Sequence, residues 1–320
     1  MIRKRARFRG VDSGAERDRS LYTRPGPPQR SGGRTVPTRP RDGNRMPRIT
    51  LAHSPDADDA FMFYGLATGK VRSSLVQFEH HLSDIQSLNE AAHEGRYGMT
   101  AISYHAYPYV ADRYILTASG SSVGDGYGPI LVSKRALAPA ELRGKTIAVP
   151  GTLTTAYLTL RLFEPEFEAK VVPFDKVLDE VAAGRADAAL VIHEGQLSYH
   201  QSGFHRILDL GAWWKEKYDL PLPLGANCVL RSLTPDVQRE CRDRLRDSIQ
   251  YALEHREEAL SYALEFSRGL DQPTAEKFVG MYVNHHTLDM LPEVVESAQK
   301  LLEMGHDAGL VSQRVKIDYV

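Results

Sequence analysis

The stretch KTIAVPGTLTTAYLTLRLF, residues 145–163, decides the fold of this chain. It starts with a short apolar run typical of a buried strand, and it continues with the apolar spacing of a helix. A strand over 170–174, a helix over 176–184 and a strand over 187–193 follow in the same alternation. Such alternation is typical of α/β proteins with mostly parallel strands, so we predict an α/β unit here.

A second series of the same plan precedes this unit. Its two predicted helices end on Gly69 and Gly95, and glycine is the residue most often found just past the end of a helix. The predicted elements are a strand over 48–53, a helix over 58–69, a strand over 76–82, a helix over 84–95 and strands over 99–105 and 128–135. No internal repeat of fixed period accompanies this similarity of plan.

The two series predict two α/β lobes, with the second lobe inserted into the first. We expect the first lobe to comprise residues 46–133 and 226–320, and the second lobe to comprise residues 134–225. The segment after Thr234 has helical spacing and is expected to complete the first lobe. A ligand cleft between the lobes is the natural consequence of this arrangement.

Composition limits the classes of function. The chain has 320 residues, of which 42% are hydrophobic and 25% charged, as in an ordinary soluble protein. Its two cysteines, Cys228 and Cys241, have neither zinc-binding nor redox spacing and cannot form a disulfide framework, which fits a reducing compartment. No window approaches the roughly 18 apolar residues that cross a bilayer, so we expect no membrane insertion.

The first 45 residues differ from the rest. They hold 13 Lys or Arg against 4 Asp or Glu, and they have little apolar surface to offset the entropy of ordering them. We predict that residues 1–45 are a disordered basic extension and that folded sequence begins near Met46. A basic arm can touch nucleic acid, but the simple extension is favoured, and we expect no nucleic-acid partner. No apolar segment of a signal peptide follows the basic residues, which predicts a cytoplasmic protein.

Polar side chains follow four of the predicted strands. In open α/β sheets, ligands bind at the carboxyl ends of strands. These ends carry hydroxyl, carboxylate and imidazole groups, a mixture suited to a polar, oxygen-rich small ligand. The residues are His53, Ser54, Asp56, Asp58 and Asp59; Ser103, Tyr104 and His105; Thr152, Thr154 and Thr155; and His193 and Glu194.

The threonine pair Thr154 and Thr155 stands at the predicted start of a helix. Backbone N–H groups and the helix dipole favour an anion at such a place, and the two hydroxyls could donate to a carboxylate. An ordinary threonine N-cap explains the same residues. Both interpretations stay open on the sequence.

His193 ends an apolar strand, and an imidazole can accept a proton near neutral pH because its ordinary pKa is about 6.5. A structural histidine is the alternative, and for Glu194 a solvated or capping charge is favoured. His80 and His81 are adjacent on a strand and point to opposite faces. No ligand spacing typical of zinc occurs, so we expect no metal and no cofactor.

Four segments together resemble a known family. They are SYHAYPYVADRY at 103–114, VPGTLTTAYL at 149–158, LVIHEGQLSY at 190–199 and LDLGAWWKEKYDLPLPLGA at 208–226. These segments are similar to the 1,4-dihydroxy-6-naphthoate synthases of the futalosine route to menaquinone, which have the two-lobed periplasmic binding protein type 2 fold. The resemblance runs from about Arg48 to the end of the chain.

The resemblance implies a lyase that splits cyclic dehypoxanthinyl futalosine, a small-molecule carboxylate, into 1,4-dihydroxy-6-naphthoate and a three-carbon fragment. It implies His193 as the catalytic base. It also implies that the substrate contacts Ala101, Ile102 and Ser103 on one side and Thr154 and Thr155 on the other.

One segment departs from the family. The first strand end reads Ser-Pro-Cys-Pro-Asn-Asp in the family, whereas this chain places acidic Asp56 and Asp58 at the Cys and Asn positions, ahead of Asp59. That wall of the site, and with it the substrate, is therefore open to question. Two alternatives remain: a chorismate dehydratase of the same pathway, which lacks the strand-end histidine, and a non-enzymatic solute receptor.

Overall fold

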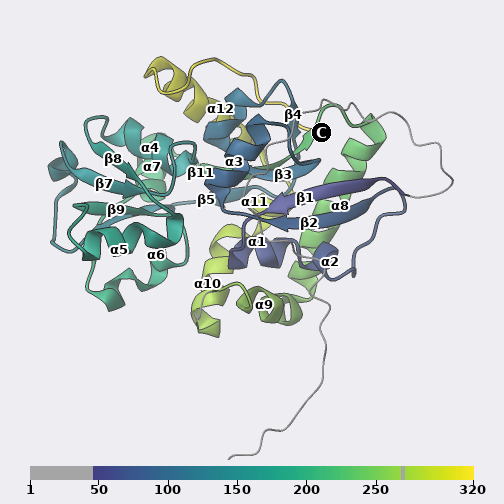
Figure 1. Cartoon of the computed structure of the whole chain (residues 1–320), viewed down its shortest axis with the longest axis horizontal. Helices are drawn as coiled ribbons and strands as arrows, with labels where there is room; N and C mark the ends of the chain where they lie inside the picture. Colours follow the sequence, from purple (N-terminus) through teal and green to yellow (C-terminus); the bar gives the residue numbers. More distant parts are fainter. Residues whose placement is uncertain (1–45, 268–270) are drawn as a thin grey trace, which may run out of the picture.

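The structure is a computed structural model that describes residues 46–267 and 271–320 (Figure 1). The predicted disordered extension, residues 1–45, lies outside the described residues. Two β-sheets lie beside each other along the long axis of the molecule, and helices flank both of them (Figure 1). The predicted α/β class with two lobes is confirmed.

The first sheet has the strand order β2-β1-β3-β11-β4, and β5 also pairs with β11. Its strands are β1 (Arg48–His53), β2 (Gln77–Leu82), β3 (Met99–Ser103), β4 (Tyr114–Leu116), β5 (Ser122–Gly124) and β11 (Leu222–Leu230). Strand β1 pairs in parallel with β2 and β3, whereas β11 is antiparallel to β3, β4 and β5. The carboxyl ends of β1 and β3 therefore meet at one edge of the sheet.

Helices from both ends of the chain cover this sheet. They are α1 (Ala57–Met62), α2 (Tyr64–Ala67), α3 (Ile85–His93), α8 (Pro235–Glu254), α9 (Arg256–Leu264), α10 (Gln272–Tyr282) and α11 (His285–Leu288), with the 3-10 helix η2 (Tyr104–Tyr109) after β3. Phe61 of α1, Leu245 of α8 and Leu260 of α9 share one apolar core with Leu51 of β1. This packing anchors the short helix α1 beside the end of β1.

Two predicted helices are each divided in the structure. The helix predicted over 58–69 breaks at Phe63, between α1 and α2. The long helical segment after Thr234 breaks at His255, where the backbone N–H bonds the carbonyl of Tyr251 and the imidazole Nδ1 lies 3.0 Å from the same oxygen. That second contact to one carbonyl marks the point at which α8 ends and α9 begins.

The second sheet has the strand order β10-β6-β9-β7-β8. Its strands are β6 (Ile130–Ser133), β7 (Thr146–Val149), β8 (Glu168–Val171), β9 (Ala188–Val191) and β10 (His205–Asp209). Its helices are α4 (Thr155–Phe163), α5 (Val177–Ala182), α6 (Gly195–Ser198) and α7 (Leu210–Tyr218), with the 3-10 helices η3 (Pro139–Leu142), η4 (Phe174–Lys176) and η5 (Tyr199–Ser202). The stretch 145–163 thus forms β7 and α4, as the sequence predicted.

The expectation of mostly parallel strands is wrong for the sheets as a whole. Among the named strands of the described residues, parallel pairing occurs only within β2-β1-β3 and β8-β7-β9. The pairs that add β6, β10, β11, β4 and β5 are antiparallel. The reason is that β6 and β11 carry the chain between the lobes and enter each sheet from the opposite direction. The strand pairing places the points where the chain passes from one sheet to the other before Ile130 and before Leu222. These points lie a few residues ahead of the predicted lobe limits at 134 and 225. The lobe limits themselves stay a prediction.

Helix α12 (Pro292–Asp307) packs on both lobes (Figure 1). Trp214 of α7 is fully buried, and its indole N–H donates to the Ser297 hydroxyl of α12 at 2.9 Å. Ser297 in turn donates to the carbonyl of Pro221, which precedes β11. The C-terminal helix therefore supports the connection between the lobes. Among the described residues, no helix has the length and apolar character of a membrane span.

Candidate active site

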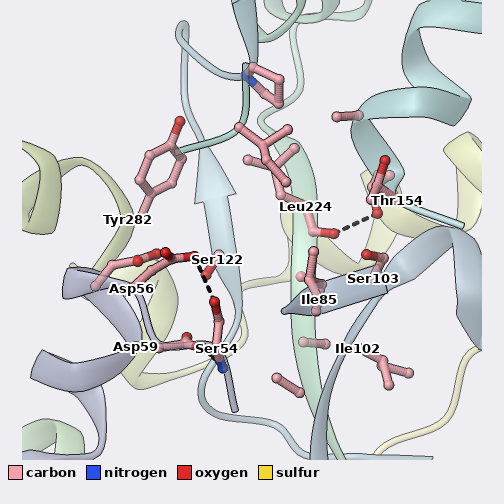
Figure 2. Close-up of a pocket in the computed structure, with 18 of the residues that line it drawn as sticks. Ser54, Asp56, Asp59, Ile85, Ile102, Ser103, Ser122, Thr154, Leu224 and Tyr282 are labelled. Atoms are coloured by element: carbon pink, nitrogen blue, oxygen red, sulfur yellow. Dashed lines mark hydrogen bonds between the residues drawn. The ribbon is translucent and has the colours of Figure 1, made fainter. Parts of the chain in front are cut away.

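A cavity lies where the strand ends of the two sheets face each other (Figure 2). All five residues predicted to contact substrate line it. So do Asp56 and Asp58, which differ from the family, and Asp59, which matches it. The lining residues are Ser54, Asp56, Asp58, Asp59, Ile85, Ala101, Ile102, Ser103, Gly120, Ser122, Pro129, Thr154, Thr155, Ala156, Ile192, Gln196, Leu224, Gly225, Ala226, Asn227 and Tyr282. The first lobe supplies most of these residues, and the start of α4 with its cap Thr154, the end of β9 and α6 contribute from the second lobe.

Ser103 at the end of β3 is fixed by Asn89 of α3. The Asn89 side-chain amide donates to the Ser103 hydroxyl at 3.0 Å, and the Ser103 backbone N–H donates to the Asn89 side-chain oxygen at 2.8 Å. Both residues are buried, so these bonds are shielded from water. These bonds fix Ser103 at the end of the wall formed by Ala101, Ile102 and Ser103.

The threonine pair is placed as predicted, but its hydroxyls are committed elsewhere. Thr154 caps α4 by accepting from the Tyr157 N–H, and its hydroxyl donates to the Gly151 carbonyl at 3.0 Å. The Thr155 hydroxyl donates to the Leu224 carbonyl of β11 at 2.5 Å. In this arrangement neither hydroxyl proton is available to a carboxylate. The backbone N–H groups of the first turn of α4, at Thr155 and Ala156, have no intrahelical acceptors and remain suited to an anion.

Three aspartates at the start of α1 form an acidic wall of the cavity: Asp56, Asp58 and Asp59. The Ser54 N–H donates to Asp59 Oδ2 at 2.7 Å, and the Ser54 hydroxyl donates to Asp56 Oδ2 at 2.6 Å (Figure 2). Burial raises the pKa of Asp59 to about 7, although the Ser54 N–H opposes this rise. Burial and the neighbouring charges of Asp59 and Asp56 raise the pKa of Asp58 well above its ordinary value. A carboxyl that keeps its proton near neutral pH can act as an acid or a base.

The two lobes meet across the cavity through Tyr282 and Gln196. The Tyr282 hydroxyl of α10 donates to the Gln196 side-chain oxygen, in α6, at 2.9 Å. Burial raises the pKa of Tyr282, so the phenol stays protonated and remains a donor. This bond fixes which end of the Gln196 side chain is the amide NH₂.

His193 is not among the residues that line the cavity. Its Nδ1 accepts from the Gly195 N–H at 3.0 Å and lies 4.0 Å from a Glu194 carboxylate oxygen, and its ring meets Phe174 edge to face. The nitrogen Nδ1 that accepts this N–H carries no proton in this arrangement. The sequence favours a solvated or capping charge for Glu194. The residue is only 5% exposed, so the solvated interpretation is wrong, and although it is the N-cap residue of α6, its side chain makes no capping hydrogen bond.

The remaining histidines form no metal site in the described residues. His53 and His80 are buried, and His53 Nε2 lies 3.2 Å from His80 Nδ1. Burial is the main reason that the pKa of His53 falls to about 3 and that of His80 to about 4. Both are therefore neutral, buried side chains that contact each other.

Sequence reasoning missed several residues of the cavity, among them the polar Gln196, Asn227 and Tyr282. Gln196 lies three residues after His193, and Asn227 is a polar residue inside the apolar run that forms β11, so each carried a signal in the sequence. Tyr282 carried none, because α10 is brought to the cavity by packing against α1, α9 and β5.

The fold, two α/β lobes with a cleft between them, is that of the periplasmic binding proteins. The alkanesulfonate-binding protein SsuA from Xanthomonas axonopodis pv. citri superposes with a TM-score of 0.65 at 14% identity, covering 86% of this chain and 98% of that one. A Candida albicans protein described as having the generic periplasmic binding protein fold superposes with a TM-score of 0.63, also at 14% identity. At such identities the likeness concerns the fold alone.

Sequence comparison resolves the family within this class. A family model described as menaquinone biosynthesis matches residues 49–307. The curated 1,4-dihydroxy-6-naphthoate synthases of Thermus thermophilus and Streptomyces coelicolor are 39% and 34% identical, over 83% and 82% of this chain and 97% and 94% of theirs. A crystal structure of an Archaeoglobus fulgidus protein is 46% identical with a TM-score of 0.80, covering 82% of this chain and 98% of that one. The chain belongs to the menaquinone biosynthesis family, as the resemblance implied.

Proposed function

We propose that this protein is a 1,4-dihydroxy-6-naphthoate synthase, a carbon-carbon lyase that splits cyclic dehypoxanthinyl futalosine in the cytoplasm. One observation carries the proposal. The cavity of this family member is lined by all five residues expected to contact that substrate, Ala101, Ile102 and Ser103 on one side and Thr154 and Thr155 on the other.

The substrate carboxylate would lie at the start of α4. The N–H groups of Thr155 and Ala156 supply donors there, and the apolar side chains of Ile102, Ile192 and Leu224 suit the aromatic part of the substrate. The substrate hydroxyls would then face the acidic wall, whose carboxyl oxygens accept hydrogen bonds.

The reaction transfers protons and needs no oxidant. A base removes a hydroxyl proton from the substrate, and the electrons of that O–H bond form the carbonyl of the departing three-carbon fragment. The carbon-carbon bond breaks as its electron pair passes into the ring, which becomes aromatic when a ring carbonyl oxygen takes up a proton. One proton is removed and one is added, so the substrate equals the sum of the two products.

The resemblance assigns the base to His193. In the arrangement described above, the lone pair of Nδ1 is used by the Gly195 N–H. Our proposal therefore requires the imidazole to leave that bond and turn toward the cavity beside Ile192 when substrate binds. Catalytic hydrogen bonds that are long or poorly aligned in a ligand-free structure commonly form only when substrate binds.

Turnover by purified variants tests the proposal. His193→Ala should bind substrate nearly normally and lose about 10² to 10⁴ in turnover, the usual contribution of a positioned general base. His200→Ala is the matched control, because His200 is exposed on the following 3-10 helix. Turnover of His193→Ala at the parental rate would remove His193 from the mechanism.

A further inference from the structure

Helix α3 of the first lobe lies at the side of the cavity where the two substrate walls approach each other. Its first residue, Ile85, lines the cavity together with Ser103 and Thr154 (Figure 2). Two further side chains of α3, Gln86 and Asn89, contact the turn 150–154, which leads into α4 of the second lobe. The hydrogen bonds between α3 and this turn therefore join the two lobes.

Gln86 binds the backbone N–H of Leu153. The Gln86 side-chain oxygen accepts from this N–H at 3.1 Å, and its side-chain NH₂ donates to Glu90 Oε1 at 2.9 Å. The bond to Glu90, four residues further along α3, leaves the amide oxygen as the end that faces the turn. Leu153 directly precedes Thr154, the N-cap residue of α4. Gln86 thus holds the backbone immediately ahead of the proposed anion site.

Gly151 of the same turn is fitted to the Gln86 side chain. A Cβ atom at Gly151 would lie 2.1 Å from Gln86 Oε1 and 2.5 Å from Gln86 Cδ, far closer than van der Waals contact allows. Gly151 does not have a positive φ, so the turn does not need glycine for its backbone conformation. The missing side chain at Gly151 is what allows Gln86 to lie against the turn.

Asn89 joins Leu153 to the other substrate wall. Its side-chain NH₂ donates to the Ser103 hydroxyl at 3.0 Å and reaches the Leu153 carbonyl oxygen at 3.4 Å. Its side-chain oxygen accepts from the Ser103 N–H. One buried side chain therefore contacts both the end of β3 and the turn before α4, and both backbone groups of Leu153 meet side chains of α3.

His105 extends this contact into the first turn of α4. Its backbone N–H donates to the Thr155 hydroxyl oxygen at 3.3 Å, and its ring Nδ1 lies 3.2 Å from the Thr154 carbonyl oxygen. The first lobe thus contacts Leu153, Thr154 and Thr155 in succession. The position of the α4 terminus is set by residues of the opposite lobe.

We propose that Gln86 is a positioning residue of the active site, which holds the first turn of α4 at the separation from the Ser103 wall that the substrate requires. This inference rests on the proposed function, in which one substrate contacts both walls. Walls held at the matching separation before binding lose less freedom when the substrate arrives, so the substrate binds more tightly. Gln86 acts through Leu153 and is not assigned any contact with the reacting atoms.

Steady-state kinetics of Gln86 variants test the proposal. Gln86→Met removes the acceptor for the Leu153 N–H and keeps a side chain of similar length. KM for cyclic dehypoxanthinyl futalosine should rise about three- to tenfold, the loss of one ordinary hydrogen bond. Turnover should stay within about twofold of the parent, because the bond is present in both the ground state and the transition state.

A charge-neutral exchange provides the rescue. Gln86→Glu/Glu90→Gln keeps an acceptor for the Leu153 N–H and keeps a hydrogen bond between the two side chains with its direction reversed. This double variant should retain the parental KM. Gln250→Ala is the matched control, because Gln250 makes the same kind of bond to Glu254 on α8 and does not line the cavity.

A double-mutant cycle tests the contact itself. Gly151→Ala should raise KM, because the added methyl group displaces the Gln86 side chain from the turn. Gln86→Ala/Gly151→Ala should have the KM of Gln86→Ala alone, since no long side chain is left to displace. Such non-additivity is expected only of residues that act through one contact.

The outcomes separate positioning from a purely structural role. A lower melting temperature with the parental KM in Gln86→Met would identify an ordinary tertiary hydrogen bond and overturn the positioning role. Additive effects of Gly151→Ala and Gln86→Ala on KM would overturn it as well. A parent protein that neither binds nor converts the substrate overturns the proposed function, and the positioning role falls with it. Conversion by the parent with unchanged KM in Gln86→Met overturns the positioning role alone.

Discussion

Replacing Asp59 by asparagine should stabilise the protein increasingly as the pH rises from 4 to 7. The folded-state pKa of Asp59 is raised from 3.8 to about 7, chiefly by burial. Below pH 3.8, the ordinary pKa of the carboxyl, both the folded and the unfolded chain hold the proton, so burial of Asp59 does not lower the free energy of unfolding. As the pH rises through this window, the unfolded chain releases the proton while the folded chain keeps it, and stability is lost. Asparagine does not titrate, so its variant avoids this loss.

The magnitude follows from the size of the shift. A displacement of roughly three pKa units corresponds to about 4 kcal/mol, at about 1.4 kcal/mol for each unit. The pKa of Asp58 is raised as well, so the effect of Asp59 alone is smaller than the full shift. We expect the free energy of unfolding of the variant, relative to the parent, to be about 2 to 4 kcal/mol higher at pH 8 than at pH 4. The Ser54 N–H bond survives, because the asparagine side-chain oxygen can accept it.

Urea unfolding of parent and variant at pH 4, 5, 6, 7 and 8 measures this gain. Taking the difference in unfolding free energy between the two proteins at each pH cancels the titration of other groups. The difference should rise up to about pH 7 and then level off. A difference that stays constant from pH 4 to pH 8 would show that Asp59 titrates normally, and the electrostatic account of the cavity would be wrong.

Three further predictions follow from the same geometry. His53 and His80 are held neutral in the fold and gain protons on unfolding below pH 6.5. The free energy of unfolding should therefore fall toward pH 4 by up to about 1.4 kcal/mol per pH unit for each of them. His80→Gln should make this fall less steep in urea titrations. Thr154→Ala should cost about 1 kcal/mol in thermal unfolding, with Thr154→Ser near the parent, because Thr154 caps α4; equal losses in both would argue against a cap. Tyr282→Phe removes the bond to Gln196 between the lobes and should increase the radius of gyration of the ligand-free protein in X-ray scattering, whereas an unchanged profile would mean that this bond does not hold the cleft closed.

The sequence predicted the elements that carry the site because their signals are local. Apolar runs of alternating type mark β1, β7 and β9, and Gly69 and Gly95 adopt the positive φ angles that favour glycine after a helix. The Thr154 cap is equally local. These features depend on neighbouring residues along the chain, so composition and spacing were sufficient.

Other features depend on contacts that sequence spacing does not encode. The pairing directions of β6 and β11 arise from the route of the chain between lobes, and Tyr282 reaches the cavity through packing of α10 on α1. The raised pKa values of Asp58 and Asp59 arise mainly from burial, which the sequence alone does not report. The orientation of His193 toward Gly195 is likewise a matter of side-chain geometry.

The most direct test of the proposed function is the stoichiometry of the products. Purified protein should convert cyclic dehypoxanthinyl futalosine to 1,4-dihydroxy-6-naphthoate and a three-carbon fragment in equal amounts, measured together by mass spectrometry, without added metal or redox cofactor. Tight binding of the substrate with no release of either product, or release of the naphthoate without the three-carbon fragment, would contradict the account.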